Sequence, residues 1–198
     1  GLGRCGYGFT WMHPDFGLTT GGPDILSVGK TIGSGLVTLA GLFFSPGVCE
    51  VFNQGSGYIM GAQTYHSHAF TCRVGLAVQQ KIVRDNLVEN VRIVGAYMKE
   101  QLKEKLKDCK IAGDVRGAGN FLSVEAVKDK STKESFDPKL AVGPKLHQRI
   151  FDKGVVVMGA SGTVGYEYHG LNDVTCFGDH VTMGPAFTFT KNHADIIV

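Results

Sequence analysis

The stretch PDILSVGKTIGSG, residues 23–35, decides how the rest of the chain is interpreted. Its apolar run at 25–28 predicts the end of a buried strand, with glycine and proline before it and a Gly/Ser turn after it. Lys30 stands at the end of this strand, and the glycines at 29, 33 and 35 let the backbone and a bulky ligand come close together. The stretch therefore predicts a strand-to-turn junction that presents one lysine.

Two interpretations of Lys30 follow from these local features. Desolvation at a strand end favours the neutral amine, which is a nucleophile that forms a Schiff base with an aldehyde. Alternatively, Lys30 is an ordinary strand-end lysine, because lysine is mostly exposed and its flexible stem carries the charge to water. The local sequence leaves both interpretations open.

Two nucleotide-binding motifs are excluded in this region. Gly29-Lys30-Thr31 ends like a phosphate-binding loop, but that motif requires glycine at the place where Asp24 stands. The glycines at 1, 3 and 6 have the spacing of the dinucleotide fingerprint, but the required strand before them and helix after them are not predicted. The N-terminal region is therefore interpreted as a glycine-rich loop.

The amino-acid composition limits the classes of protein to which this chain can belong. With 198 residues, 43% of them hydrophobic, the chain can form a sizeable core in one or two domains. Its 20 basic and 18 acidic side chains are nearly balanced, which indicates neither a nucleic-acid nor a membrane-surface partner. No apolar run is long enough to cross a membrane, and the five cysteines lack Cys-x-x-Cys spacing. Reduced thiols are typical of the cytoplasm or another reducing intracellular compartment.

Periodicity predicts the secondary structure. Helices are expected over about 70–84, from 87 to about 108, over 141–153, and beginning at Thr190. Strands are expected over 36–44, 120–127, 155–158, 180–183 and 187–189, with a turn at 113–119 and a loop at 159–179. Strands that alternate with helices after the long second helix indicate a compact α+β domain.

Six pieces of sequence follow one another in a fixed order. They are Gly1-x-Gly3-Arg4-x-Gly6; Pro23 to Lys30 with Gly33-x-Gly35; Gln63-Thr64-Tyr65 with His68; Asn86-Leu87 with Asn90; Gly113 to Gly119; and Lys128-Asp129-Lys130 with Phe136-Asp137-Pro138. In this order they resemble the C-terminal half of the class III pyridoxal-phosphate-dependent aminotransferases, over essentially the whole chain. The resemblance implies an α/β chain of fold type I. Residues 1–85 would end the large, mostly parallel-sheet cofactor domain, and residues 86–198 would form the small C-terminal α+β domain.

The resemblance also implies an activity and the residues that carry it. The activity is transfer of an amino group from an amine or amino acid to a keto acid or aldehyde, with pyridoxal 5'-phosphate as cofactor. Lys30 matches the lysine that holds the cofactor as a Schiff base and then moves the proton between substrate and cofactor. Thr64 matches the threonine that binds the cofactor phosphate of the neighbouring subunit, which implies a homodimer.

Two other functions stay open beside this one. Racemases, aminomutases and decarboxylating relatives share the lysine and the cofactor, so the reaction can differ. A truncated, non-catalytic paralogue would act as an assembly partner instead. The family's residues for the ring nitrogen and most of those for the phosphate would lie upstream of Gly1, and both ends of the sequence look cut, so a longer protein is expected.

Four further residues bear on the substrate and on metal binding. Arg116 matches a frequent family arginine, for which a substrate role and an ion pair, with Asp114 as partner, are both open. Thr182 stands where relatives that bind an α-carboxylate often carry arginine, which favours an amine or ω-amino substrate. His66 and His68 alternate like metal ligands, but no third ligand is near in sequence, so no metal site is predicted.

Overall fold

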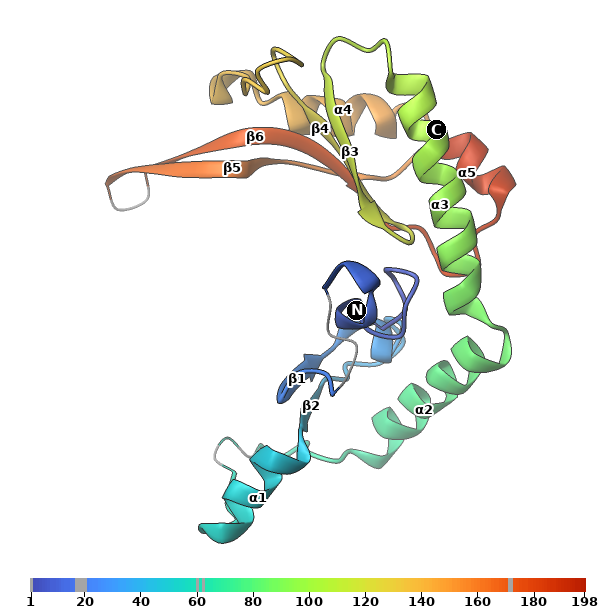
Figure 1. The fold of residues 1–198 in the computed structure, drawn as a ribbon, viewed down its shortest axis with the longest axis vertical. Coiled ribbons are helices and arrows are strands. Elements are labelled where there is room, and N and C mark those ends of the chain that lie inside the picture. Colours follow the sequence, from blue (N-terminus) through green and yellow to red (C-terminus); the bar gives the residue numbers. More distant parts are fainter. Residues whose placement is uncertain (1, 17–20, 60, 62, 171–172) are drawn as a thin grey trace. The chain divides into compact units, whose positions relative to one another are not determined.

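The computed structural model describes residues 2–16, 21–59, 61, 63–170 and 173–198. The chain divides into two compact units, residues 1–88 and residues 89–198, which are described separately here (Figure 1). Within the described ranges, no helix is both long and apolar enough to cross a membrane. Short 3-10 turns occupy Thr10–Met12, Pro14–Phe16, Lys30–Ile32 and Pro138–Leu140.

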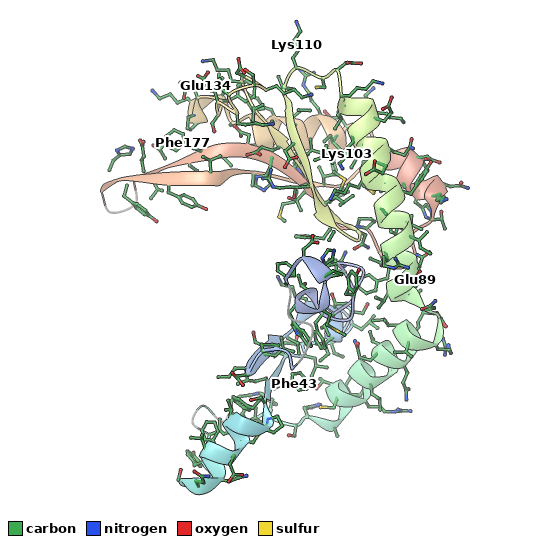
Figure 2. All side chains as sticks on the ribbon, in the orientation of Figure 1. Phe43, Glu89, Lys103, Lys110, Glu134 and Phe177 are labelled. Atoms are coloured by element: carbon green, nitrogen blue, oxygen red, sulfur yellow. The ribbon has the colours of Figure 1, made fainter. Side chains whose placement is uncertain are left out.

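Two short strands form the centre of the first unit. Strand β1 (Ile25–Val28) pairs antiparallel with β2 (Gly41–Phe44), and Ile25 lies opposite Phe44. The strand predicted over 36–44 is therefore too long at its start, because Leu36 closes a turn by donating its N–H to Gly33 O. The prediction that both strands are buried is also wrong for this chain, since Phe43 is 53% exposed (Figure 2).

Two helices complete the first unit. Helix α1 (Pro46–Gln54) begins after Ser45, whose side chain accepts a hydrogen bond from Val48 N and donates one to Asp24. This serine thus caps the helix and ties it to the start of β1. Helix α2 (Ala69–Arg84) confirms the prediction of a helix over 70–84.

Helix α3 (Leu87–Leu106) carries the core of the second unit. Its predicted apolar stripe is buried, and each such side chain contributes roughly 1.5–3 kcal/mol when it leaves water. The buried members are Val91, Val94, Met98 and Leu102. The opposite face is charged and exposed, as Lys103 shows (Figure 2), and is linked by pairs spaced three residues apart such as Arg92–Glu89.

A four-stranded antiparallel sheet packs with this helix, in the order β3-β4-β6-β5. Its strands are β3 (Ala112–Ala118), β4 (Phe121–Ala126), β5 (Met158–Gly170) and β6 (Asp173–Met183). Two predictions are wrong for this sheet (Figure 1). The segment 113–119, predicted to be a turn, is mostly strand β3, and the segment 159–179, predicted to be a loop, belongs to the long β5–β6 hairpin. Their glycines hide the alternation typical of strands, so backbone pairing with the neighbouring strand, and not local propensity, decides the structure.

The two faces of this sheet differ in chemistry. Leu122, Val124, Val181 and Met183 alternate onto one face, where they join α3 in the hydrophobic core. The residues that alternate with these in β4 and β6, and the residues opposite them in β3, carry polar side chains on the other face. We call this surface the polar sheet face; it consists of Asp114, Arg116, Ser123, Glu125, His180 and Thr182.

The remaining two helices flank this sheet. Helix α4 (Val142–Phe151) and helix α5 (Lys191–Ile197) confirm the predicted helices over 141–153 and after Thr190. Thr190 and His193 form a capping box at the start of α5. The strand predicted at 187–189 does not form: residues 184–190 are irregular and lead from β6 into α5.

Candidate functional site

Lys30 lies in a tight turn directly after β1. Its φ is 54°, in the left-handed region, and its carbonyl accepts a hydrogen bond from Gly33 N at 3.1 Å. A side chain in this region costs roughly 1–3 kcal/mol and persists only where the surroundings impose it. Backbone strain of this kind clusters at functional sites, so the turn is a candidate site on structural grounds.

Helix α2 braces this turn from one side. Gln79 Nε2 donates a hydrogen bond to Ile32 O at 3.4 Å. Gly75 approaches the same loop so closely that a Cβ atom there would lie 2.4 Å from Leu39 Cδ2. The close approach requires glycine at this position of the helix, and it explains why the lysine turn is held in one conformation.

The amine of Lys30 is accessible. Its side chain is exposed, and within the described part of the chain Nζ has no hydrogen-bond or ion-pair partner. Gly29 beside it is open, since a Cβ atom at this position would meet nothing within 4 Å. The turn thus presents a free amine with space around it, which attack on an aldehyde requires.

Thr64 lies in an exposed turn that leads into α2. Gln63 organises this turn: its side-chain Oε1 accepts a hydrogen bond from Tyr65 N at 2.8 Å, and its carbonyl accepts one from His66 N at 3.1 Å. Thr64 itself is exposed. A threonine in this setting is free to bind an anion.

A groove of about 850 Å³ lies between this turn and the two strands. Val28 and Gly41 line it from the strands, and Tyr65 and His68 line it from the turn. Lys30 and Thr64 are absent from its lining, so this groove does not bring these two predicted residues together.

The two histidines near Thr64 have different surroundings. His68 caps α2, because its Nδ1 accepts a hydrogen bond from Thr71 N at 3.4 Å. His66 is exposed. In the ranges that the structure describes, no three His, Cys, Asp or Glu side chains are grouped so that they could hold a metal ion.

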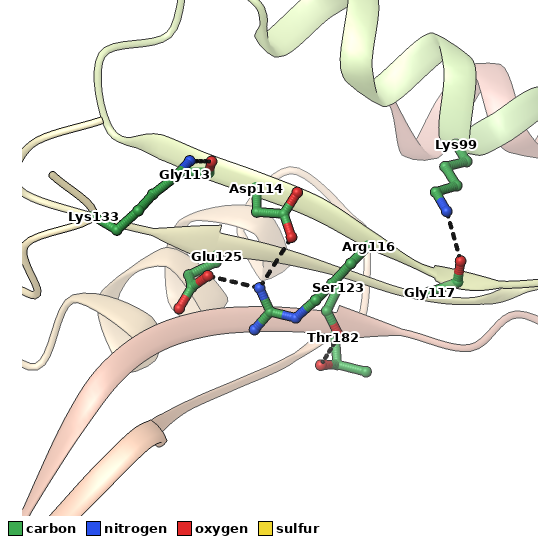
Figure 3. Close-up of polar contacts among 9 residues, drawn as sticks. All are labelled: Lys99, Gly113, Asp114, Arg116, Gly117, Ser123, Glu125, Lys133 and Thr182. Atoms are coloured by element: carbon green, nitrogen blue, oxygen red, sulfur yellow. Dashed lines mark hydrogen bonds and ion pairs between the residues drawn. The ribbon is translucent and has the colours of Figure 1, made fainter. Parts of the chain in front are cut away.

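Arg116 lies on the polar sheet face between two carboxylates (Figure 3). Its Nη1 donates to Glu125 Oε2 at 2.6 Å and lies 3.4 Å from Asp114 Oδ2. Burial alone would lower the pKa of Arg116, but the hydrogen bond and charge of Glu125, helped by Asp114, outweigh it and raise the pKa above its ordinary value. The ion-pair interpretation of Arg116 therefore has direct geometric support, while a substrate role stays a prediction.

Thr182 is paired across the sheet with Ser123. The two residues lie opposite each other in the β4–β6 register, and their hydroxyl oxygens are 2.7 Å apart (Figure 3). Ser123 is in turn opposite Arg116 on β3. Position 182 thus contributes to a neutral hydroxyl pair, which lies beside an arginine that carboxylates already engage.

Sequence reasoning missed Glu125 and Ser123 as members of this face. Asp114 was the expected partner of Arg116, whereas Glu125 is closer and its side chain is only 16% exposed. The alternation of residues 121–126 was the available signal, because it places Ser123 and Glu125 opposite the buried face of the strand.

Comparison with known proteins identifies relatives of the whole chain. The family model "Aminotransferase class-III" matches residues 1–198. An uncharacterized aminotransferase of Schizosaccharomyces pombe is 35% identical over 198 residues, which are 100% of this chain and 40% of that protein. The chain thus spans about two fifths of this relative.

Solved structures give the same result. A thermostable (S)-enantioselective omega-transaminase from Thermomicrobium roseum is 31% identical with a TM-score of 0.81, covering 100% of this chain and 39% of that chain. An amine transaminase from an uncultivated Pseudomonas species, solved in a PLP-bound form, is 26% identical with a TM-score of 0.82, covering 100% of this chain and 40% of that chain.

Proposed function

Because this chain belongs to the class III aminotransferases, we propose that it carries the catalytic lysine of a pyridoxal-phosphate-dependent transaminase. The complete protein moves an amino group from an amine or amino acid to a keto acid or aldehyde. The observation that carries this proposal is the Lys30 turn, which presents a free, exposed amine in a strained and braced conformation. We assign residues 1–85 to the end of the cofactor domain and residues 86–198 to the small domain, in keeping with two compact units that divide after Val88.

The residues present fit pyridoxal phosphate. The group needs an unpaired amine for its aldehyde and a donor for its phosphate, and Lys30 and Thr64 supply these functions. When bound, the cofactor supplies an electron sink for the carbon that loses its proton. Lys30 would hold the cofactor through Nζ. The same amine is placed to take and return the substrate proton as general base and acid.

We place Thr64 at the site of a second copy of the chain, in a homodimer. Two features support this assignment: Thr64 is exposed, and it does not line the groove beside its own unit's strands. Loss of the Thr64 hydroxyl would weaken cofactor binding without changing the attachment at Lys30. Mixed dimers with Thr64→Val in one copy and Lys30→Ala in the other test the assignment. If Thr64 serves the partner's lysine, both defects fall on one site of the mixed dimer and the other site stays intact. If Thr64 serves its own chain's lysine, each site carries one defect.

The substrate class is inferred from residues 116 and 182, the two positions that the family resemblance connects with substrate binding. Arg116 is held by Glu125 and Asp114, and Thr182 is a neutral hydroxyl, so the polar sheet face offers no free guanidinium for a carboxylate. We therefore favour an amine or ω-amino donor. All five cysteines are free thiols, which supports a reducing compartment for the protein.

The decisive experiment uses the complete protein with pyridoxal phosphate. A visible absorption band, followed by borohydride reduction and peptide mapping, should locate the modification at Lys30. If one molecule of keto acid is consumed for each molecule of amine, the reaction is a transamination. A modified residue other than Lys30, or no binding at all, would overturn the proposal.

A further inference from the structure

The turn that carries Lys30 is held partly from inside and partly from outside. Within the turn, the N–H of Gly33 donates a hydrogen bond to Lys30 O at 3.1 Å. The carbonyl of Ile32 is paired outside the turn: among the residues that the structure describes, its donor is Nε2 of Gln79 on α2, at 3.4 Å and 47 residues further along the chain. Because backbone carbonyls need a partner when they leave water, this contact ties the turn to α2.

The turn needs such outside support because its backbone is strained. Lys30, Ser34 and Gly35 have positive φ values of 54°, 52° and 75°. Glycine adopts these values freely, but a residue with a side chain persists there only where its surroundings impose the conformation. Lys30 and Ser34 stand on either side of Ile32 in the chain, so Gln79 acts in the middle of the strained segment.

Helix α2 is a fixed platform for this contact. His68 caps its first turn, and Asp85 accepts hydrogen bonds from two basic side chains at its last turn. Gly75, one helical turn before Gln79, faces the same carbonyl, since a Cβ atom there would lie 3.5 Å from Ile32 O. One face of a capped helix therefore meets the turn at two successive levels.

We propose that Gln79 is a positioning residue for Lys30: by holding Ile32 O, it keeps the turn in the conformation that directs the Lys30 amine. The left-handed φ of Lys30 sets the direction of its Cα–Cβ bond, so a turn that relaxes to an ordinary φ redirects the side chain. The inference rests on the proposed function, in which Nζ of Lys30 takes and returns the substrate proton. A displacement of about 1 Å at such a group slows the chemical step.

The test uses Gln79→Met in the complete, cofactor-loaded protein. Methionine keeps the length and helix propensity of the side chain but has no hydrogen to donate. We expect kcat to fall on the order of tenfold while KM for the amino donor stays nearly unchanged, because Lys30 acts in the chemical step. Rates are divided by the fraction of sites that borohydride reduction traps at Lys30 in a parallel sample, so incomplete loading does not count as lost activity.

Two further readouts do not depend on turnover. In complete protein prepared without cofactor, the attachment of added pyridoxal phosphate to Lys30 should slow several-fold in Gln79→Met, as followed by visible absorption and peptide mapping. Hydrogen exchange of the Gly33 amide, which donates to Lys30 O, should accelerate, because the turn opens more often without its outside contact.

Gln80→Met is the matched control. Gln80 is the same type of residue one position further along α2, and it is exposed, whereas Gln79 is partly buried. This variant should keep the wild-type kcat, the wild-type rate of cofactor attachment and the wild-type exchange at Gly33. An equal loss of kcat in Gln80→Met would overturn the inference, because the effect would then follow from any change in this part of the helix.

The remaining outcomes separate the two proposals. If wild-type protein attaches no cofactor at Lys30, the proposed function fails, and the inference fails with it. If wild-type protein is active and Gln79→Met accelerates exchange but leaves kcat and the attachment rate unchanged, Gln79 is purely structural and only this inference is overturned. A fall in kcat without faster exchange at Gly33 also overturns it, because the effect then does not pass through the turn.

Discussion

Asp179 Oδ1, on β6, accepts a hydrogen bond at 2.7 Å from the backbone N–H of Gly143, in the first turn of α4, although 36 residues separate them. Helix α4 has no local cap, because the residue before it is Ala141, which has no side-chain acceptor and a φ of 47°. Asp179 is 1% exposed and also accepts a hydrogen bond from Ser161 Oγ at 2.7 Å. A carboxylate from the sheet therefore caps the helix and fixes the β5–β6 hairpin to it.

Asp179→Ala should destabilise the second unit by about 2–3 kcal/mol, because it removes charge-assisted hydrogen bonds and leaves a buried helix N–H unpaired. Ser161→Ala should cost about 1 kcal/mol, since it removes one of the two bonds. Calorimetry gives the loss of stability, and hydrogen exchange should locate it in the first turn of α4. If the backbone amides of this turn are equally protected from hydrogen exchange in wild type and in Asp179→Ala, the capping role is contradicted.

Lys30→Ala should lower turnover by on the order of a thousandfold or more, because the proton-transfer group and the covalent attachment are lost together. The protein should remain folded, since the Lys30 side chain is exposed. Lys105→Ala, at an exposed position on α3, is the control and should keep full activity. Steady-state rates and circular dichroism on the same samples decide the result; an active Lys30→Ala protein would exclude the assignment.

Thr182→Arg should increase the preference for α-carboxylate donors over simple amines by roughly ten- to a hundredfold in kcat/KM. The new guanidinium would lie beside Ser123 and provide a bidentate partner for a carboxylate. Thr182→Val, which removes the hydroxyl without adding charge, should not shift the preference toward carboxylates. The measurement compares kcat/KM for paired donors that differ only in the carboxylate, and an unchanged ratio would argue that Thr182 lies away from the substrate.

Arg116→Ala should destabilise the second unit by about 2–4 kcal/mol, because it leaves the mostly buried Glu125 without its charge partner. Pairing Arg116→Ala with Glu125→Gln should restore part of this loss, as a double-mutant cycle measures. A substrate role gives a different pattern: KM for a carboxylate substrate rises, and Glu125→Gln does not restore it. Stability and KM are compared for wild type, the two single variants and the double variant. The comparison distinguishes an ion-pair role of this arginine from a substrate role.

Tyr97 links α3 to α5 in a way that depends on pH. Its hydrogen bond to Asp195, with partial burial and the charge of Asp195, raises the pKa of the phenol above its ordinary value of 10.0. The folded-state pKa is raised, so the stabilisation is fully present below about pH 10 and is lost as the pH rises through the folded value. Tyr97→Phe should therefore reduce stability at neutral pH, and the difference from wild type should shrink at alkaline pH. Ultraviolet titration of the phenol gives the pKa; a value at or below the ordinary one would contradict the contact.

The helices could be predicted from local sequence. The helix predicted over 70–84 is α2, and the one predicted from residue 87 is α3, which ends two residues earlier than expected. Helical hydrogen bonds join residues four apart, so periodicity and capping residues within a short window carry the information. The local sequence around Lys30 leaves two interpretations open, and the catalytic role of this lysine stays a prediction that the family pattern favours.

The prediction of a strand at 120–127 is confirmed by β4, but β3 and most of the β5–β6 hairpin could not be predicted from local sequence. Each of these strands pairs with its neighbour in the chain, but their glycines break the alternation of apolar and polar residues that indicates a strand. Some polar contacts could not be predicted because they join residues far apart in the chain, as do those of Asp179 with Gly143 and of the Asn90 and Asn120 amides with residues 185–189. The family and the helices follow from the amino-acid sequence, because the order of motifs and the short-range periodicity can be read along the chain. The partners of buried polar side chains depend on folding, because the pairing of β4 with β6 and the packing of helices on this sheet bring together residues that are far apart in the sequence.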